Sequence, residues 1–391
     1  MYVLSSSILL SLVVVAAATN VASVWTFETG GRVWSGPALS VDGNAIFVGS
    51  NDHNLYALNA TTGEQMWAFK TGSAVESSPS VGDDGTVYFP SWDGYVYAVA
   101  GATGDLVWKF ATDHAGEAEG GTSPTGIGSK PQLGPDGTVY VTTPMPYIDN
   151  KMVRNGTVYA LEGSTGALLW MTFAGMATRS PTLSADGETL FLGNSDGKFF
   201  ALDSSTGKTK WTKTVNGAGS PYKQWGVPAI CADGTVYVQN CNGHLYSLDS
   251  STGRENWIIK VEVGGCEAKP SIADDGTIFI GTDDGVKAVE AGDRKASIKW
   301  ESKIGSVQTG PTIGADGVTL YAATVYDSGS DSGSVYALDI QNGNSKWRFN
   351  PPECSANEDL RCYFSESTPV VGADGTIFIG SDDTYVYALP A

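Results

Sequence analysis

The sequence predicts an all-β protein, an eight-bladed β-propeller whose ring is closed by its own amino-terminal strand. Three observations carry this prediction. The 391 residues include 49 glycines and only 17% charged residues, which suits many tight turns better than long helices. One repeat unit recurs eight times along the chain. Each unit contains an Asp-Gly turn and ends in a tryptophan, but one such tryptophan stands before the first turn and none follows the last turn.

Each repeat begins with a proline that is followed five positions later by Asp-Gly. The prolines are Pro37, Pro79, Pro131, Pro181, Pro228, Pro270, Pro311 and Pro369, and the aspartates are Asp42, Asp84, Asp136, Asp186, Asp233, Asp275, Asp316 and Asp374. Runs of alternating β-branched and aromatic residues follow, such as TVYF at 86–89, and these are typical of strands. After a second turn and a second run comes a Thr-Gly turn, then the tryptophan. Each unit therefore has four short strands, A to D.

The strand-D tryptophans predict how the ring closes. They are Trp25, Trp67, Trp108, Trp170, Trp211, Trp257, Trp300 and Trp347. The first precedes every Asp-Gly turn and the last Asp-Gly turn has no tryptophan after it, so VWTF at 24–27 must supply strand D of the final blade. Such closure removes the open sheet edges that invite aggregation. We predict one propeller domain over residues 24–391, with these tryptophans filling the gaps between blades.

The amino terminus is typical of a secretory signal. An apolar run from Ile8 to Ala18 precedes small residues that fit cleavage after Ala18 or after Ser23. The run is shorter than the roughly 20 apolar residues of a spanning helix. We therefore expect residues 1–23 to be removed, the mature chain not to insert directly into a membrane, and the protein to be extracellular, periplasmic or in an organelle lumen. In a eukaryotic host, sequons at Asn59 and Asn155 would accept glycans.

The charge of the chain excludes one class of partner. Forty-two acidic residues against 23 basic residues give a net charge of −19. Such a field repels the phosphates of nucleic acids and anionic lipid headgroups. We expect no nucleic-acid partner.

Five cysteines in an exported chain suggest disulfides with one thiol left over. Cys354 and Cys362 fall in one long loop between blades, and we predict that they pair. Cys241 and Cys266 lie in loops of neighbouring blades on one face, and we predict a second pair. Cys231 would then remain a free thiol.

The segments ALNATTGEQMW (57–67), ALDSSTGKTKW (201–211) and SLDSSTGRENW (247–257) resemble the tryptophan-docking repeat of PQQ-like, or quinoprotein-type, propellers. AVEAGDRKASIKW (288–300) departs from that repeat because it is two residues longer and lacks Thr-Gly. The resemblance implies one of two activities. Some members are dehydrogenases that hold pyrroloquinoline quinone and Ca²⁺ over the central channel, and others are non-catalytic scaffolds such as the bacterial outer-membrane assembly propeller.

The dehydrogenases of that family use a disulfide between adjacent cysteines and a catalytic aspartate. In this chain no two cysteines are adjacent, and no aspartate occupies the three positions before any strand-A proline. We therefore expect neither a cofactor nor catalysis. A quinoprotein oxidoreductase that depends on pyrroloquinoline quinone and Ca²⁺ stays as the alternative.

Loop lengths indicate which face binds. The loops between strands B and C and between strand D and the next strand A share one face, here called the loop-rich face. Every substantial insertion falls there: 111–130, 143–156, 215–226, 324–334 and 350–367. Insertions confined to one face of a repeat protein mark its binding side. We predict a secreted or lumenal scaffold propeller that engages a protein or a glycan through this face.

A second candidate site is the mouth of the central channel, formed by the three positions before each strand-A proline. Trp34 and Trp225 belong to opposed blades there, and acids and bases lie between them. Two opposed aromatic rings could stack a planar ligand whose carboxylates bind the basic groups, or a sugar in a carbohydrate-binding or lyase site. The competing interpretation is that these positions are merely polar strand tips. The candidates are Trp34, Glu76, Lys130, Arg179, Trp225, Glu267, Lys269, Gln308 and Glu366.

Overall fold

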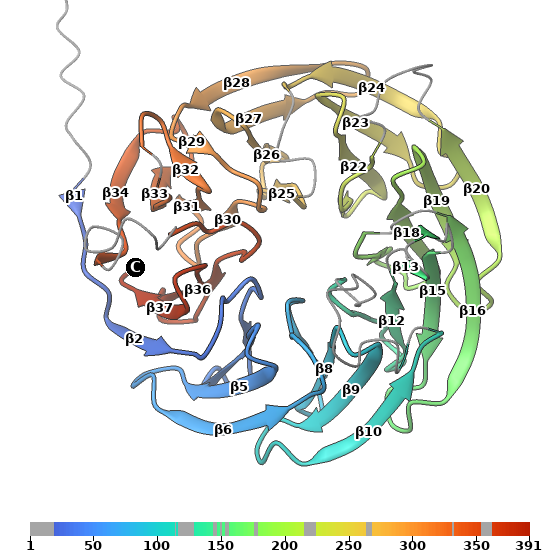
Figure 1. Ribbon diagram of the computed structural model, residues 1–391. Coiled ribbons are helices and arrows are strands. Elements are labelled where there is room, and N and C mark those ends of the chain that lie inside the picture. Colours follow the sequence, from blue (N-terminus) through green and yellow to red (C-terminus); the bar gives the residue numbers. More distant parts are fainter. Residues whose placement is uncertain are drawn as a thin grey trace, which may run out of the picture.

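The computed structural model describes residues 19–113, 115, 129–143, 147–148, 151–152, 156–175, 179–214, 224–262, 268–330, 332–352 and 362–391. Within them the chain forms eight antiparallel blades arranged as a ring around a central channel (Figure 1). The predicted eight-bladed all-β propeller is therefore confirmed. Most of the predicted signal peptide lies outside the described residues, so its cleavage stays a prediction. Among the described residues, no helix is long and apolar enough to span a membrane.

In blades one to four, strand A lies at the channel and strand D at the outer rim. The strands are β3 (Ala38–Leu39), β4 (Ala45–Gly49), β5 (Asn54–Asn59) and β6 (Gln65–Lys70); β7 (Ser80–Val81), β8 (Thr86–Pro90), β9 (Tyr95–Ala100) and β10 (Leu106–Ala111); β11 (Gln132–Leu133), β12 (Val139–Thr142), β15 (Gly156–Leu161) and β16 (Leu168–Gly175); and β17 (Thr182–Leu183), β18 (Thr189–Gly193), β19 (Lys198–Asp203) and β20 (Thr209–Thr214).

Blades five to eight repeat the arrangement. Their strands are β21 (Ala229–Ile230), β22 (Thr235–Asn240), β23 (His244–Asp249) and β24 (Glu255–Lys260); β25 (Ser271–Ile272), β26 (Ile278–Thr282), β27 (Gly285–Ala291) and β28 (Ala296–Ser302); β30 (Thr312–Ile313), β31 (Thr319–Ala323), β33 (Val335–Asp339) and β34 (Ser345–Phe349); and β35 (Val370–Val371), β36 (Ile377–Gly380), β37 (Tyr385–Leu389) and β2 (Trp25–Glu28). Two short antiparallel pairs, β13 (Tyr147–Ile148) with β14 (Lys151–Met152) and β29 (Gly305–Ser306) with β32 (Tyr326–Asp327), form separate two-stranded sheets outside the blades.

The Asp-Gly turns between strands A and B share one geometry, and blade two illustrates it. Asp84 Oδ1 accepts a hydrogen bond from the backbone N–H of Thr86 at 2.9 Å. Gly85 has a φ of 81°, which a residue with a Cβ adopts only at a cost. The aspartate replaces a missing backbone partner and the glycine allows the chain to reverse, which explains why this dipeptide recurs in every blade.

The strand-D tryptophan of one blade docks on the turn between strands C and D of the next blade, which is Thr-Gly in most blades and Asn-Gly in blade seven. Trp67 Nε1 donates to the carbonyl oxygen of Gly101 at 2.9 Å. Its ring also covers Gly104, where an added Cβ would lie 2.8 Å from the indole. The same indole N–H contact joins Trp25 to Ala60, Trp108 to Gly163, Trp170 to Ser204, Trp211 to Ser250 and Trp300 to Ile340. The predicted docking role is thus observed at these tryptophans.

Blade six, whose sequence lacks Thr-Gly, receives its neighbour's tryptophan differently. Trp257 of blade five is only 6% exposed and packs in an apolar cluster with Ala291 and Ala296 of blade six. Trp257 is thus buried against blade six without a Thr-Gly turn, in a cluster that includes these small alanine side chains.

The amino-terminal strand closes the ring as predicted. β2 pairs with β37 in an antiparallel register that places Trp25 opposite Ala388 and Phe27 opposite Val386. In Figure 1 this strand lies beside the last blade, at the junction between the two ends of the chain. A further strand, β1 (Thr19–Asn20), adds in parallel to β34 as a fifth strand of blade seven. That addition was not anticipated by the repeat.

Candidate ligand site at the channel mouth

A cavity of about 400 Å³ opens at the mouth of the channel. The predicted candidates that line it are Trp34, Glu76, Lys130, Arg179, Lys269, Gln308 and Glu366. These residues line one cavity because each stands just before strand A of its blade, and strand A of every blade lies at the channel. Glu267 lies outside the described residues.

Trp225 does not line the channel mouth, contrary to the prediction. Its side chain is 0% exposed and packs between blades four and five, with its ring centroid 5.4 Å from Phe199 and 4.8 Å from Tyr246. Its Cβ also closes over Gly193, where an added Cβ would lie 2.3 Å away. Trp225 therefore fills an apolar gap that strand tips leave between these blades, and the expected pair of opposed stacking rings is not formed.

Trp34 keeps its place at the mouth. Its indole is half-buried and lines the cavity, and the guanidinium carbon of exposed Arg32 lies 5.9 Å from the ring centroid. A cation at this distance from an aromatic face is attracted by the ring quadrupole. The mouth thus presents one aromatic side chain with a cation beside it.

The acidic side of the mouth carries an unusual carboxyl group. Burial, and then the charge of Glu366, raise the pKa of Glu76 from 4.5 to about 7, while Asn51 and Trp92 oppose the rise. A carboxyl that loses water and faces another carboxylate prefers its neutral form. Glu76 is therefore a group that exchanges a proton near neutral pH.

Two indole N–H groups are buried next to carboxyls on this side. In the described part of the chain, neither Trp34 Nε1 nor Trp92 Nε1 makes a hydrogen bond of standard geometry. Both are nevertheless close enough to stabilise a negative charge, Trp34 that of Asp382 and Trp92 that of Glu76. The two indoles therefore lower the pKa of these carboxyl groups by electrostatic attraction.

The basic side of the mouth is formed by Lys130 and Lys269. Protein atoms enclose both side chains, although water still reaches them within the channel, and this enclosure lowers the pKa of each. The positive charge of Lys269 lowers the pKa of Lys130 further. In a molecule with a net charge of −19, two cations therefore lie near one another at the channel mouth.

Arg179 is held by a side chain that the sequence did not single out. With its amide oriented to suit the contact, the side-chain oxygen of Gln224 accepts hydrogen bonds from Arg179 Nη2 and Nε. Gln224 also lines the mouth cavity. It stands within the insertion 215–226, where no repeat register marks it, so the sequence offered no signal for this role.

A recurring aspartate fixes the loops around the mouth. In blade two, Asp93 Oδ2 accepts hydrogen bonds from the Tyr97 hydroxyl at 2.7 Å and from the Gly72 N–H at 2.8 Å. Asp52 with Tyr56, and Asp383 with Tyr387, repeat the carboxylate–tyrosine contact at 2.7 Å. The sequence signal was available, since each aspartate precedes its tyrosine by four residues.

The cysteines agree in part with the predicted pattern. Cys231 is a free thiol, and Cys241 and Cys362 are disulfide-bonded. Their expected partners, Cys266 and Cys354, lie outside the described residues. The two pairings therefore stay predictions.

A family model matches nearly the whole chain. Its description is outer membrane protein assembly factor BamB, and it matches residues 11–127, 93–223 and 218–391. Among curated proteins, the chain is 26% identical over 208 residues to tetrathionate hydrolase from Acidithiobacillus ferrooxidans. That match covers 50% of this chain and 40% of the hydrolase, so it spans less than half of the relative's length.

Solved structures share the architecture at low identity. BamB from Moraxella catarrhalis has a TM-score of 0.70 and 18% identity, and the alignment covers 95% of this chain and 100% of that one. Quinohemoprotein alcohol dehydrogenase from Comamonas testosteroni has a TM-score of 0.64 and 14% identity, over 95% and 76% of the two chains. At such identity these likenesses establish the propeller fold and leave the activity to the site.

Proposed function

Because this chain belongs to the family described as outer membrane protein assembly factor BamB, we propose that it is a non-catalytic scaffold propeller that binds another protein through its loop-rich face. We also propose that it reaches that partner by the secretory route. A glycan is the second choice of partner for the same face.

One observation carries the proposal beyond family membership. Arg32 and Trp34 lie together on the loop that enters blade one, and half-buried Trp92 lies on the B–C turn of blade two. The aspartates Asp52 and Asp93 tie these loops to neighbouring backbone and tyrosine groups. Arginine and tryptophan on a fixed scaffold are the side chains that most often dominate protein–protein binding energy. We call Arg32, Trp34 and Trp92 the aromatic sector.

The experiment compares two matched double variants. R32A/W34A removes a cation and an aromatic ring from the aromatic sector, and K208A/R254A removes cations from exposed C–D turns on the opposite face. Each purified protein captures partners from the source organism's secreted or envelope fraction, and cross-linking with mass spectrometry maps the contact. We expect a protein that K208A/R254A still captures and whose capture by R32A/W34A is reduced at least about tenfold, since loss of a central anchor costs about 2 kcal/mol or more.

Two results would contradict the proposal. One is a partner whose cross-links map to the A–B and C–D turns. The other is a set of captured proteins that R32A/W34A leaves unchanged.

The quinoprotein alternative is less well supported by the described residues. The second stacking ring expected at the mouth, Trp225, is fully buried. In the residues that the structure describes, no group of three or more His, Cys, Asp or Glu side chains is placed to hold a metal ion. We therefore assign no step to pyrroloquinoline quinone. The activity in the name of the tetrathionate hydrolase is not proposed either, because that match covers half of this chain.

A further inference from the structure

We propose that the central channel binds a small dianion between Lys130 and Lys269. The ligand class is a short dicarboxylate or an inorganic oxyanion with two negative charges. The site shares the mouth cavity with Trp34 of the aromatic sector, but its two lysines precede the inner strands of blades three and six, and it does not depend on the proposed protein partner.

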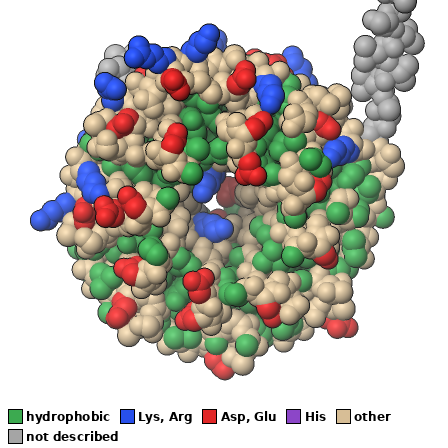
Figure 2. Space-filling view, turned by 180° about the vertical axis from the view of Figure 1, so that it is seen from behind, with side chains coloured by type: hydrophobic (Ala, Val, Ile, Leu, Met, Phe, Trp, Pro, Cys, Tyr) green, Lys and Arg blue, Asp and Glu red, His purple; other side chains and the backbone are tan. Residues whose placement is uncertain are grey.

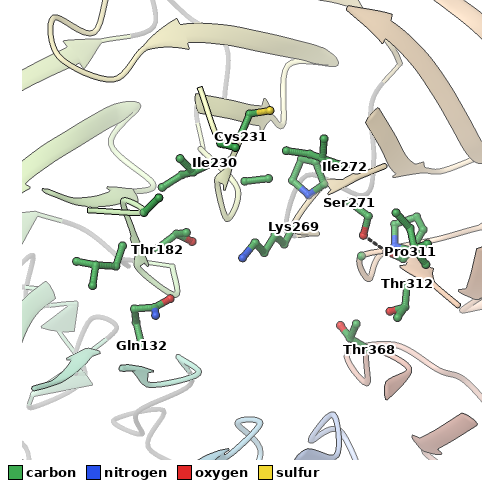
Figure 3. Close-up of a pocket in the computed structure, with 17 residues that line it drawn as sticks. Gln132, Thr182, Ile230, Cys231, Lys269, Ser271, Ile272, Pro311, Thr312 and Thr368 are labelled. Carbon is green, nitrogen blue, oxygen red and sulfur yellow. Dashed lines mark hydrogen bonds between the residues drawn. The ribbon is translucent and has the colours of Figure 1, made fainter. Parts of the chain in front are cut away.

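The two lysines lie where the mouth narrows into the deeper channel. Both line the mouth cavity and also a deeper cavity of about 470 Å³. Each precedes a strand-A proline, Pro131 or Pro270, which favours an extended backbone at the preceding residue. Figure 3 shows Lys269 reaching from the inner strand of blade six into the channel, toward the side where Gln132 and Thr182 lie.

Contacts from the next blade fix both positions. The backbone N–H of Lys130 donates to Ser180 Oγ of blade four at 2.9 Å. Lys269 is packed by blade seven so closely that a Cβ added to Gly310 would lie 2.5 Å from the Lys269 carbonyl oxygen. The backbone at both lysines is therefore fixed by contacts with the neighbouring blades.

The two ammonium groups have no counter-charge in the described part of the chain. Neither lies within ion-pair distance of a carboxylate there, in contrast to Lys287, which contacts Glu262 at 2.9 Å and Glu301 at 3.1 Å. Among the described residues, none that lines the deeper cavity of about 470 Å³ or the neighbouring one of about 740 Å³ is acidic. Figure 2 shows basic side chains inside the central opening. Two like charges near one another repel, and an anion with two negative charges would neutralise both.

An additional polar group supports a ligand at this level. Thr309 is 5% exposed and lines the mouth cavity, and its hydroxyl has no hydrogen-bond partner among the described residues. Buried hydroxyls are normally paired, and an oxyanion would supply the missing acceptor. Glu76 and Glu366 line the mouth cavity but not the deeper cavity. An anion is therefore favoured at the lysines, on the side of the mouth away from these two carboxyl groups.

The test measures binding of sulfate and succinate to the mature chain by calorimetry at pH 7, with chloride as the monovalent control. We expect one dianion site per chain, at least tenfold weaker binding in K130M or K269M, and no binding in K130M/K269M. K210M is the matched control, because Lys210 is exposed on β20, away from the channel, and its ammonium group donates hydrogen bonds to the Glu188 carbonyl oxygen and the Thr189 hydroxyl. Sulfate and succinate arms distinguish an inorganic oxyanion from a dicarboxylate.

A second measurement covers the event that the variants fold poorly. The wild-type chain is methylated at lysines with and without the dianion, and the modified positions are read by mass spectrometry. Protection of Lys130 and Lys269 but not of Lys210 supports the site. Binding that survives K130M/K269M, or the absence of dianion binding and of protection at millimolar concentration, overturns it. Loss of dianion binding with intact protein capture by K130M/K269M would leave the proposed scaffold function standing.

Discussion

At the scale of single residues, Glu76 couples the channel mouth to pH. Its pKa of about 7 in the folded chain lies above its usual 4.5, so folding favours the protonated carboxyl. The stability that Glu76 contributes is full below pH 4.5 and is lost as the pH rises through about 7. Glu366, Asn51 and Trp92 are the groups that set this pKa.

We therefore predict that E76Q raises the melting temperature at pH 8 by a few degrees and leaves it nearly unchanged at pH 5. The physical reason is that glutamine cannot carry the buried negative charge that faces Glu366. Calorimetric melting at both pH values checks this result. E64Q, at an exposed turn, serves as the control and should show no such pH-dependent gain. A melting temperature for E76Q below that of the wild type at pH 8 would contradict the prediction.

A second residue-scale prediction concerns the glycine under a docking tryptophan. Gly104 has a φ of 78°, and a Cβ there would lie 2.8 Å from the ring of Trp67. G104A should therefore lower the free energy of unfolding by about 2–4 kcal/mol through backbone strain and displacement of the ring. G85A is a close control, because Gly85 has a φ of 81° with open space around its Cβ position. In urea unfolding, equal losses in the two variants would show that ring docking adds nothing.

The residue scale also shows how far the sequence could locate the site. Spacing from the strand-A proline brought Glu76, Lys130 and Lys269 to one cavity, because every strand A starts at the channel. The same spacing misplaced Trp225, since a position in the column does not decide whether a side chain turns to the channel or into the gap between blades. The large apolar ring of Trp225 packs into the apolar gap between the blades, beside Phe199 and Tyr246.

At the scale of elements, the ring depends on β2, which supplies the outer strand of a sheet made otherwise from the other end of the chain. Trp25 and Phe27 pack against the apolar cluster between blades eight and one. Deleting residues 24–28 removes these contacts together with the pairing to β37.

We predict that this deletion lowers the free energy of unfolding by several kcal/mol, as expected for loss of two large side chains and a strand edge. Urea unfolding of the deletion variant measures the loss. The control removes residues 1–20, which takes away β1 and its two paired residues but leaves β2. If both truncated chains unfold at the wild-type midpoint, closure by β2 does not stabilise the ring.

Elements that the repeat specifies were predictable, and those outside it were not. Asp-Gly turns and docking tryptophans recur because each blade imposes the same backbone reversal and the same gap. The parallel strand β1 and the pair of β29 with β32 involve two residues on each strand. Such short contacts depend on how neighbouring loops meet in space, which no sequence period records.

At the scale of the whole molecule, the chain has a net charge of −19, yet Lys130 and Lys269 are the charged side chains among the described residues that line the deeper cavities of the channel. The outer field repels anions at long range, whereas the two lysines attract them at short range. Salt screens the long-range repulsion over about 8–10 Å at physiological ionic strength. At the proposed site, the acidic exterior would therefore slow the entry of anions into the channel, and the two lysines would determine which anions bind.

The closure by β2 also sets an order in time. Of the strands in the last blade, the ribosome makes β2 before all eight inner strands and its partner β37 after them, and synthesis of the intervening chain takes roughly 20–80 s at typical rates. During that interval Trp25 already has a docking place, because its indole N–H bonds to Ala60 of blade one, which is made soon after it. β2 can thus dock on blade one through Trp25 before β37 is made, and the ring closes when β37 pairs with it.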